Sequence, residues 1–586
     1  MILSPRPSAP ARSAGVLIVL ALAPLWLIGM FGRGLWTPDE PREADIAWRM
    51  SVQNDRALPQ LAGMPFLEKP PLSYWMSAGA LSLWGDSAGA ARAPNLLYAL
   101  SGALALGALA FAMQADVAAA VIAALIAMSA LTAYRVVIWL AADACLLAGC
   151  TLALLGAWRG YHSREGAPKA AGYALMHFGA AIGFMAKSAP GWLVPALALL
   201  TLIAWERRWS ELRRWELYAG FALQLLIIGP WLLAVWHTAG GSDALRTLFW
   251  HNVVGRFIRV AAPAALDYTT GHRNSPGKYL IELPLYLLPW TLIVAAALVR
   301  AWRRARAPDI SGTPWRFALA CCLPLLVLLS LAATARDIYV APALLGFGLL
   351  AGLWAHEAQP APTRLDSLAV RGSRWLVLVL AWAIASALAL LALAGAGARA
   401  ACLLAAVGVI ASAQVASLLA ARAQRGGALK QSLFYLYSGY AAALCVAALA
   451  ALPIIDRWQD LPTLARRIRA DTVQQPLGLL NPDETTVAML DHGLRTPFTI
   501  VASSAGNTRT AVADWLATQG PAARVLVLLP GHAPGSLNRL LARFHDRAPA
   551  GDGVAGELVA SGAAVLIERY ELPQGRRYAL LAAPPP

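Results

Sequence analysis

Charged residues are scarce in this chain. Asp, Glu, Lys and Arg together make up 14% of its 586 residues, whereas hydrophobic residues make up 59%. A soluble globular protein is about one quarter charged, so this composition excludes an ordinary soluble enzyme. Apolar runs recur at about 20 residues, the length of a helix that spans a bilayer, where lipid offers no partner for free backbone groups. We therefore predict a mainly α, polytopic membrane protein.

Cysteine is also rare, and acidic residues are outnumbered by basic ones. The six cysteines lie inside apolar runs without metal-site spacing, so we interpret them as small buried hydrophobic residues. The formal net charge is +16, but residues 456–586 hold 13 basic and 12 acidic side chains. The basic excess therefore lies in short loops between the apolar runs, and we expect no nucleic-acid partner.

The basic loops predict the orientation of about thirteen membrane-spanning helices. Alternate loops carry clusters of Arg and Lys, whereas the short loops between them carry single residues such as Arg135 and Arg399. By the positive-inside rule the N-terminus is cytoplasmic, and an odd number of spans places the C-terminal residues outside. The predicted spans are residues 16–31, 93–111, 117–133, 136–157, 172–185, 191–205, 218–236, 279–299, 315–333, 338–354, 375–394, 400–420 and 433–452.

The pattern predicts two domains. Residues 1–455 form a transmembrane domain with two long outer loops, 32–92 and 237–278, and long ordered loops often carry function. Residues 456–586 are predicted to form a small α/β domain outside the membrane. Its strand-like runs are TTVAML, FTIVA, RVLVLLP and AAVLIERYEL, separated by helical stretches such as AVADWLATQ.

The first outer loop begins with an unusual group of charges, WTPDEPR. Thr37 and Glu40 have the spacing of a helix capping box, which gives these two residues a purely structural explanation. That box does not need Asp39, which lies three residues before Arg42 and so on the same helix face. The two side chains form either a local ion pair of little energy or part of a site.

A second group follows in FLEKPPLSYW. Pro70 excludes Lys69 from the α region, so Glu68 and Lys69 lie on a stiff extended stretch, and Pro71 can begin the next helix. Lys69 is then either a lysine that snorkels to the interface or a cation held at headgroup depth to bind an anion.

Other polar residues fall on the same side of the membrane under the predicted orientation. Asp143, in LAADACLL, is predicted to lie about one and a half turns inside a span, and an intramembrane carboxylate indicates a functional site. Several cations outside suit a phosphate-bearing substrate, and outside the cytoplasm an activated sugar must arrive on a lipid phosphate. The further candidates are Lys187, Arg256, His272, Arg336 and Tyr339.

The order of these motifs resembles the bacterial lipid A aminoarabinose transferases, within the wider family of membrane glycosyltransferases that includes protein O-mannosyltransferases. The resemblance covers roughly residues 16–455, and departs from the family pattern at LAADACLL and after Lys187, which Ser-Ala-Pro follows instead of Gly-Pro. The motifs that carry the resemblance are Asp39-Glu40-x-Arg42, Glu68-Lys69-Pro70-Pro71-Leu72-x-Tyr74-Trp75 and Asp143.

The resemblance implies a GT-C fold in the bacterial inner membrane, with the active site and C-terminal domain in the periplasm. It also implies inverting transfer of a sugar from undecaprenyl phosphate to lipid A phosphate or another glycan. Asp39 and Asp143 match the family's acidic pair, and Arg42 and Lys69 its phosphate-side cations. Arg256 and Tyr339 are further donor-phosphate ligands that the resemblance implies. Glu68 matches an acid that contacts a divalent metal, which is the one cofactor that the resemblance implies. The expected supporting residues are Glu40, Glu68, Lys187, His272 and Arg336.

Two alternatives stay open from the sequence. A protein O-mannosyltransferase-like enzyme would share the site and use Ser or Thr hydroxyls as acceptors. A transporter or flippase of lipid-linked substrates would place ionisable residues at mid-span in inverted repeats. The sequence shows neither repeats nor such mid-membrane charges, which favours an enzyme.

Overall fold

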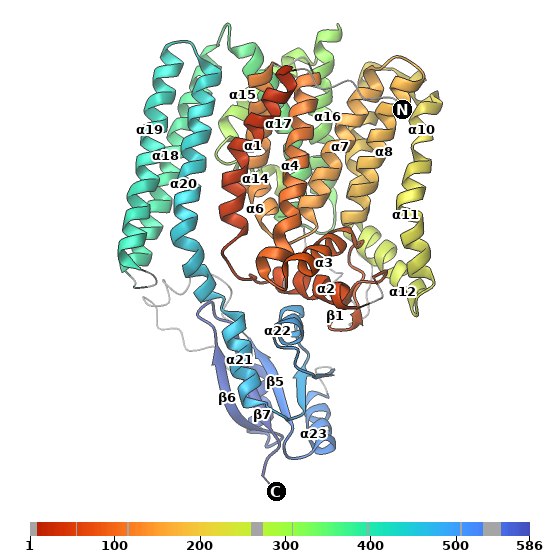
Figure 1. The fold of residues 1–586 in the computed structure, drawn as a ribbon, viewed down its shortest axis with the longest axis vertical. Helices are drawn as coiled ribbons and strands as arrows, with labels where there is room; N and C mark the ends of the chain where they lie inside the picture. The colour runs from red at the N-terminus through yellow and green to blue at the C-terminus, as the bar shows by residue number, and fades with distance from the viewer. Residues whose placement is uncertain are drawn as a thin grey trace. The chain divides into compact units, whose positions relative to one another are not determined.

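The computed structural model describes residues 9–53, 56–113, 116–258, 274–307, 309–393, 395, 398–503, 507–530 and 552–585. These residues fall into two compact units. Unit 1 is built from residues 1–32, 53–59 and 65–451, and unit 2 from residues 33–52, 60–64 and 452–586. Figure 1 shows the long helices of unit 1 and the sheet of unit 2.

Unit 1 is a multi-pass bundle of apolar helices, as predicted. Within the described residues, nine helical segments are long and apolar enough to cross a membrane, or eleven if two bent pairs each count as one span. The bent pairs are α5 (Val117–Ser129) with α6 (Leu131–Ile138), at 70°, and α14 (Lys278–Tyr286) with α15 (Thr291–Arg304), at 119°. The helices of the nine segments are α1 (Ala9–Met30), α4 (Ala88–Ala112), α7 (Asp143–His162), α10 (Trp215–Ala219) with α11 (Phe221–Trp236), α16 (Thr313–Leu331), α17 (Ala341–Ala358), α18 (Arg364–Leu393), α19 (Arg399–Arg425) and α20 (Leu429–Trp458). The segment of α20 continues into α21 (Leu461–Asp471), which belongs to unit 2.

The predicted number of thirteen spans is not confirmed, although each predicted run is largely helical. Two runs coincide with α8 (Ala167–Lys187) and α9 (Pro190–Glu206), which are outside the nine. Helix α9 has only 17 residues, and α8 carries the buried polar residues Lys169 and His177. Burial inside the bundle, rather than contact with lipid, allows a helix to keep such residues.

The predicted span 136–157 is broken, which changes the position of Asp143. Helix α5 (Val117–Ser129) is followed by α6 (Leu131–Ile138), and α7 begins only at Asp143. Buried Asn95 on α4 donates to the carbonyl oxygens of Val137 and Trp139, at 3.1 and 2.6 Å, which stabilises the break. Asp143 therefore lies at a helix N-terminus, and its predicted depth of one and a half turns is wrong.

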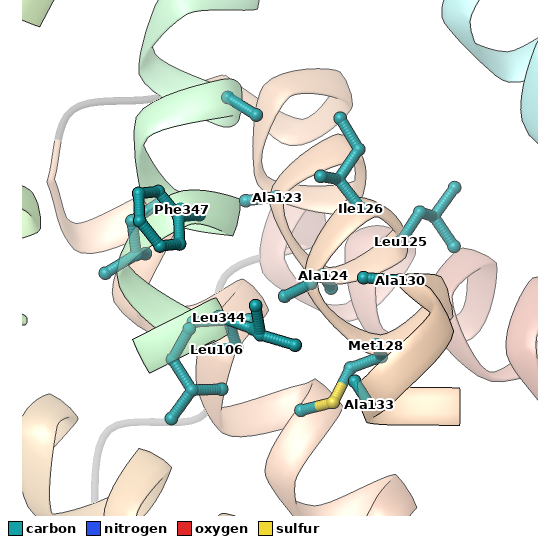
Figure 2. Close-up of a cluster of buried hydrophobic side chains, with 14 of the residues drawn as sticks. Leu106, Ala123, Ala124, Leu125, Ile126, Met128, Ala130, Ala133, Leu344 and Phe347 are labelled. Atoms are coloured by element: carbon teal, nitrogen blue, oxygen red, sulfur yellow. The ribbon is translucent and has the colours of Figure 1, made fainter. Parts of the chain in front are cut away.

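Small residues allow the helices of unit 1 to pack closely. A Cβ atom added at Gly156 of α7 would lie 2.1 Å from the backbone nitrogen of Met176 in α8. At Gly348 of α17 it would lie 2.6 Å from the carbonyl oxygen of Ala123 in α5. Backbone contact of this kind drives helix association where lipid removes the hydrophobic driving force. Figure 2 shows side chains of this core, with labels on Leu106, Ala123, Ala124, Leu125, Ile126, Met128, Ala130, Ala133, Leu344 and Phe347.

The two predicted outer loops contain short helices. The first holds α2 (Glu40–Val52), the small sheet of β1 (Gln60–Leu61) and β2 (Met64–Pro65), and α3 (Leu72–Trp84). Pro71, which was predicted to begin the next helix, is the N-cap residue of α3, and the helix itself begins at Leu72. In the second, α12 (Gly241–Arg246) leads into a π-helix, η2 (Thr247–Val254), and then α13 (Gly255–Phe257). The other short elements are η1 (Trp209–Arg213), α14 (Lys278–Tyr286), α15 (Thr291–Arg304), η4 (Ile310–Gly312) and η5 (Asp337–Val340).

Unit 2 contains the predicted α/β domain. Its described strands form one sheet in the order β4-β3-β5-β7-β6, in which β3 pairs in parallel with β4 and β5, and β7 pairs in antiparallel with β5 and β6. Helix α2 packs against α22. The elements are β3 (Leu477–Leu480), α22 (Glu484–Leu494), β4 (Thr499–Val501), α23 (Thr508–Gln519), β5 (Arg524–Leu529), α25 (Gly553–Ala560), β6 (Val565–Glu571) and β7 (Arg577–Ala582).

One strand prediction is wrong, because TTVAML lies in helix α22. The side chain of Asp483 caps this helix by accepting from the N–H of Thr486, at 3.0 Å. The Thr486 hydroxyl is also hydrogen-bonded to the Tyr578 hydroxyl, at 2.9 Å. Capping and tertiary contacts thus override the strand preference of the β-branched residues.

Candidate functional site

A cavity of about 120 Å³ in unit 1 collects most of the predicted site residues of that unit. Its walls come from the stretch before α3, the start of α7, the junction of α8 and α9, the end of η2 with α13, the end of α16, and η5 with the start of α17. Segments far apart in the sequence therefore meet at one place. The predicted residues that line the cavity are Glu68, Lys69, Asp143, Lys187, Arg256 and Tyr339.

Asp143 and Lys187 form an ion pair in one wall of the cavity. The Nζ atom of Lys187 lies 2.5 Å from Oδ1 of Asp143, with side-chain exposures of 16% and 6%. The carboxylate is in the first turn of α7 and the ammonium in the last turn of α8, so each helix dipole favours its charge. Lys187 also lies over the ring of Tyr339, 4.9 Å from its centroid.

A second charge group joins Glu68, Lys69 and Arg256. One carboxylate oxygen of Glu68 lies 3.7 Å from Nζ of Lys69, and the other lies 3.6 Å from Nη2 of Arg256. These separations are those of ion pairs but exceed hydrogen-bond length. A phosphate with suitable geometry can therefore compete with Glu68 for the two cations. The cavity thus has the charge expected of an anion site, since the cations among its described lining residues outnumber the carboxylates.

Backbone hydrogen bonds hold the Arg256 segment against the loop after α16. The carbonyl oxygen of Arg256 accepts from the N–H groups of Ala333 and Thr334, at 3.1 and 3.3 Å. These bonds hold the backbone of Arg256 beside that of Thr334, and both residues line the cavity.

Sequence reasoning missed three polar lining residues: Ser188, Asn252 and Thr334. Ser188 has a positive φ of 59°, which the sequence gives no means of predicting. Asn252 is in FWHNVVGRF, and its proximity to Arg256 was the one available signal. Thr334 lies two residues before the candidate Arg336, which was its one signal, and only the fold brings the loop after α16 beside α13.

One predicted supporting residue of unit 1, Arg336, is not among the described residues that line the cavity. Arg336 precedes η5, and its backbone N–H and carbonyl both bond to the hydroxyl of buried Tyr279, at 3.1 and 3.0 Å. Arg336 thus belongs to the segment that carries Tyr339. His272 lies outside the described residues.

Asp39, Glu40 and Arg42 belong to unit 2, where Arg42 lies among carboxylates. Arg42 is 5% exposed, and its guanidinium lies 3.2 Å from Asp39 and from Glu43 and also contacts Glu484 of α22. The predicted pairing of Asp39 with Arg42 is therefore present. Binding of a donor phosphate by Arg42 stays a prediction, and a phosphate would have to compete with these carboxylates.

The predicted capping box of Thr37 and Glu40 is wrong. Thr37 donates its hydroxyl and its N–H to Gln459, both at 2.8 Å. The Glu40 carboxylate instead accepts from Arg33, at 2.7 and 2.9 Å, and from the N–H of Trp36. Tertiary partners replace the local reciprocal bonds, and α2 begins at Glu40 itself.

Asp45 is a buried carboxyl group of the same unit. It is fully buried on α2, accepts from the N–H of Ala62 at 2.9 Å, and lies 3.8 Å from Arg49. Burial, followed by hydrogen bonding and repulsion from Asp491, raises the pKa of Asp45 to about 9. At neutral pH this side chain is therefore a neutral acid.

The described residues contain no group of three or more His, Cys, Asp or Glu side chains that could hold a metal ion. Glu68, the predicted metal contact, has two cations within 4 Å, so the residues present do not fit a conventional metal site. Metal contact by Glu68 stays a prediction, and no chemical step below depends on it.

Comparison with known proteins supports the resemblance. Residues 68–236 match the family model of dolichyl-phosphate-mannose-protein mannosyltransferases. The chain is 29% identical over 370 residues to the undecaprenyl phosphate-alpha-4-amino-4-deoxy-L-arabinose arabinosyl transferase of Pseudomonas paraeruginosa, covering 63% of this chain and 64% of that protein. Identity to a Pseudomonas aeruginosa protein of the same name is 30% over 371 residues, with the same coverage. The match thus spans slightly less than two thirds of these relatives.

Two crystal structures have the same fold over nearly the whole chain. ArnT from Cupriavidus metallidurans, bound to undecaprenyl phosphate, superposes with a TM-score of 0.69 and 19% sequence identity, covering 98% of both chains. The apo state of that protein gives a TM-score of 0.67, covering 97% of this chain and 98% of the other. The chain is therefore similar in sequence to the undecaprenyl phosphate-aminoarabinose arabinosyl transferases and has the GT-C fold of ArnT.

Proposed function

We propose that this protein is a glycosyltransferase that moves a sugar from undecaprenyl phosphate to a lipid A phosphate. The names of its sequence relatives support the donor class, and the ligand of the Cupriavidus structure supports the carrier lipid. The sugar in those names, 4-amino-4-deoxy-arabinose, is the first donor to test. Lipid A as the acceptor rests on the resemblance of the motifs.

The observation that carries this proposal is the charge composition of the cavity. Lys69, Lys187 and Arg256 line a partly apolar space together with the carboxylates Glu68 and Asp143. A lipid-linked sugar phosphate needs apolar walls for its chain and positive charge for its phosphate. The leaving phosphate gains charge in the transition state, so cations fixed in advance stabilise that state more than the bound substrate.

The reaction is a single inverting displacement. An acceptor oxygen attacks the anomeric carbon, the bond from that carbon to the phosphate oxygen breaks, and undecaprenyl phosphate leaves with the bonding electrons. Lys69 and Arg256 stabilise the leaving phosphate, while Asp143, paired with Lys187, forms another part of the wall. A lipid A phosphate is already nucleophilic at neutral pH, since its second pKa is about 6, and needs no base. A hydroxyl acceptor would need a general base, for which Asp39 stays the candidate from the sequence.

A protein O-mannosyltransferase-like activity is the second candidate, because the family model of residues 68–236 carries that name. The two candidates share the donor side of the site and differ in the acceptor. Transport of a lipid-linked substrate is a third candidate. In that case the sugar would stay attached to its carrier lipid.

The proposed location is the bacterial inner membrane, with the N-terminus in the cytoplasm and the cavity and the C-terminal domain in the periplasm. The placement of Arg and Lys between the predicted spans supports this orientation. Reporter fusions after Ala358 and after Arg425, expected on the cytoplasmic side, would test it.

Mass spectrometry of lipid A tests the function directly. The protein is expressed in a host that makes the aminoarabinose donor but lacks its own transferase, alongside Lys69→Ala and Asp143→Ala. We expect a mass increment of one aminosugar per modified phosphate, which both variants lose. An unchanged lipid A spectrum from membrane-inserted protein contradicts lipid A as the acceptor, and sugar on secreted peptides would then favour the second candidate.

A further inference from the structure

Two polar side chains of the cavity have no role in the proposed phosphate chemistry. Asn252 and Thr334 both line the cavity and are 8% and 6% exposed. The Oδ1 atom of Asn252 and the Oγ1 atom of Thr334 are buried without a hydrogen-bond partner among the described residues. Buried polar atoms are nearly always paired, and an unpaired one is costly, so such atoms beside a ligand cavity indicate contacts that a ligand completes.

The orientation of Asn252 determines what it can bind. Its Nδ2 atom donates to the carbonyl oxygens of Leu67 and Thr247, at 3.3 and 3.4 Å. The amide nitrogen is therefore on the side of the protein backbone, and Oδ1 can only accept. Ionised phosphate oxygens also only accept, so Oδ1 is matched by the hydroxyl or ammonium group of a ligand and not by its phosphate.

The local backbone around Asn252 gives a second, independent indication. Asn252 lies in the π-helix η2, a rare geometry that is found frequently at functional sites. The backbone N–H of Thr334 donates to the carbonyl oxygen of Arg256, which holds the backbone of Thr334 beside that segment. Asn252 and Thr334 are thus carried by two segments that are bonded to each other.

We propose that Asn252 and Thr334 bind the sugar of the donor, so that one part of the cavity holds the phosphate and this part recognises hydroxyl or ammonium groups. The inference rests on the proposed function, whose substrate carries such groups. A site built to pair with a substrate group discriminates strongly against an analogue without it, because its own polar atoms are left unpaired. These residues would therefore determine which sugar is transferred.

The test is donor binding by the full-length protein in nanodiscs without acceptor. The two ligands are undecaprenyl phosphate-aminoarabinose and undecaprenyl phosphate alone. The variants are Asn252→Ala, Thr334→Val, which keeps the shape but removes the hydroxyl, and Thr334→Ser, which keeps the hydroxyl. We expect Asn252→Ala and Thr334→Val to weaken binding of the sugar-bearing lipid by about 10- to 100-fold. Affinity for undecaprenyl phosphate stays within about twofold, and Thr334→Ser retains most of the wild-type preference.

Each other outcome overturns the inference. Equal losses for both ligands would mean that the residues support the phosphate side or only the fold, and unchanged affinities would mean that they do not contact the sugar. A wild-type protein that binds both lipids equally also refutes recognition of the sugar. Failure of the proposed function alone gives a different result. The wild type would then bind the sugar-bearing lipid preferentially and the variants would lose this affinity, but no acceptor would receive sugar.

Discussion

The ion pair of Asp143 and Lys187 allows a sharp test of whether these charges serve chemistry or only stabilise the helix bundle. Its two side chains are largely buried and 2.5 Å apart. At an effective dielectric constant of about 20, two unit charges at this distance attract by about 6–7 kcal/mol, most of which offsets their desolvation. Removal of one partner leaves the other charge uncompensated, at a cost of about 3–5 kcal/mol in free energy of unfolding.

The perturbation is a set of three variants: Asp143→Asn, Lys187→Met, and the exchange of the two residues, Asp143→Lys with Lys187→Asp. Each single variant is expected to lose about 3–5 kcal/mol in free energy of unfolding, toward the lower value because the pair lines a cavity that water can enter. The exchange restores the ion pair but reverses both helix-dipole interactions, so it should lose only about 1–2 kcal/mol. Reversible unfolding in mixed micelles measures these values, and donor turnover is measured in parallel.

If the two charges act in the reaction, the exchanged protein is stable but inactive, because the carboxylate and the ammonium have changed places in the cavity. Recovery of activity in the exchanged protein would refute a chemical role and leave the pair as a structural link between α7 and α8. Additive losses in the exchanged protein, within about 0.5 kcal/mol, would refute the ion pair itself.

Three further predictions follow from other parts of the molecule. Arg256→Gln should lower kcat/KM for the lipid-linked sugar by about 100-fold, because removal of one donor that stabilises charge costs about 3 kcal/mol in the transition state. The control Arg399→Gln, at an exposed position, should leave kcat/KM unchanged. Equal kinetics of the two variants would contradict the role of Arg256 in binding the phosphate. Asp45→Asn should flatten the pH dependence of stability. The pKa of Asp45 is about 9 in the folded state and about 3.9 in the unfolded state, so only the folded state holds this proton between these values, and the free energy of unfolding of the wild type falls as pH rises, by up to about 1.4 kcal/mol per pH unit. Thermal melting of the full chain from pH 5 to 9 measures this dependence. A steeper decline in the variant would show that the sign is wrong. Gly156→Val should prevent α7 and α8 from packing, because its Cβ would lie 2.1 Å from a backbone nitrogen, and a wild-type yield of monodisperse, heat-stable protein would argue against that contact.

The sequence predicts those site residues that belong to recognisable local motifs. The stretch of Glu68 and Lys69 before two prolines, the isolated Asp143, and Arg256 in an outer loop each suggested a role in binding a charged lipid. The fold brings them to one cavity with Lys187 and Tyr339. Asn252 and Thr334 could not be predicted in the same way, because an amide and a hydroxyl are common residues whose burial and missing partners depend on the packed structure.

Two local patterns were misleading, one because tertiary partners were available and the other because a helix cap precedes it. The capping box at Thr37 is locally sound, but Gln459 and Arg33 provide alternative partners. The TTVAML run has strand-like residues, but Asp483 caps a helix there. In both cases a residue distant in sequence or a specific cap contributes more than the propensity of a few residues.

The sequence by itself determined that this chain spans a membrane many times and ends in an α/β domain. Hydrophobic runs of bilayer length and basic loops contain that information directly, because the lipid solvent acts on each segment separately. Only the tertiary structure decided that Asp143 starts a helix and faces Lys187, 44 residues away, and that Arg42 lies among carboxylates of unit 2. Such pairings depend on which segments pack together, and a residue's own neighbours in the sequence do not encode them.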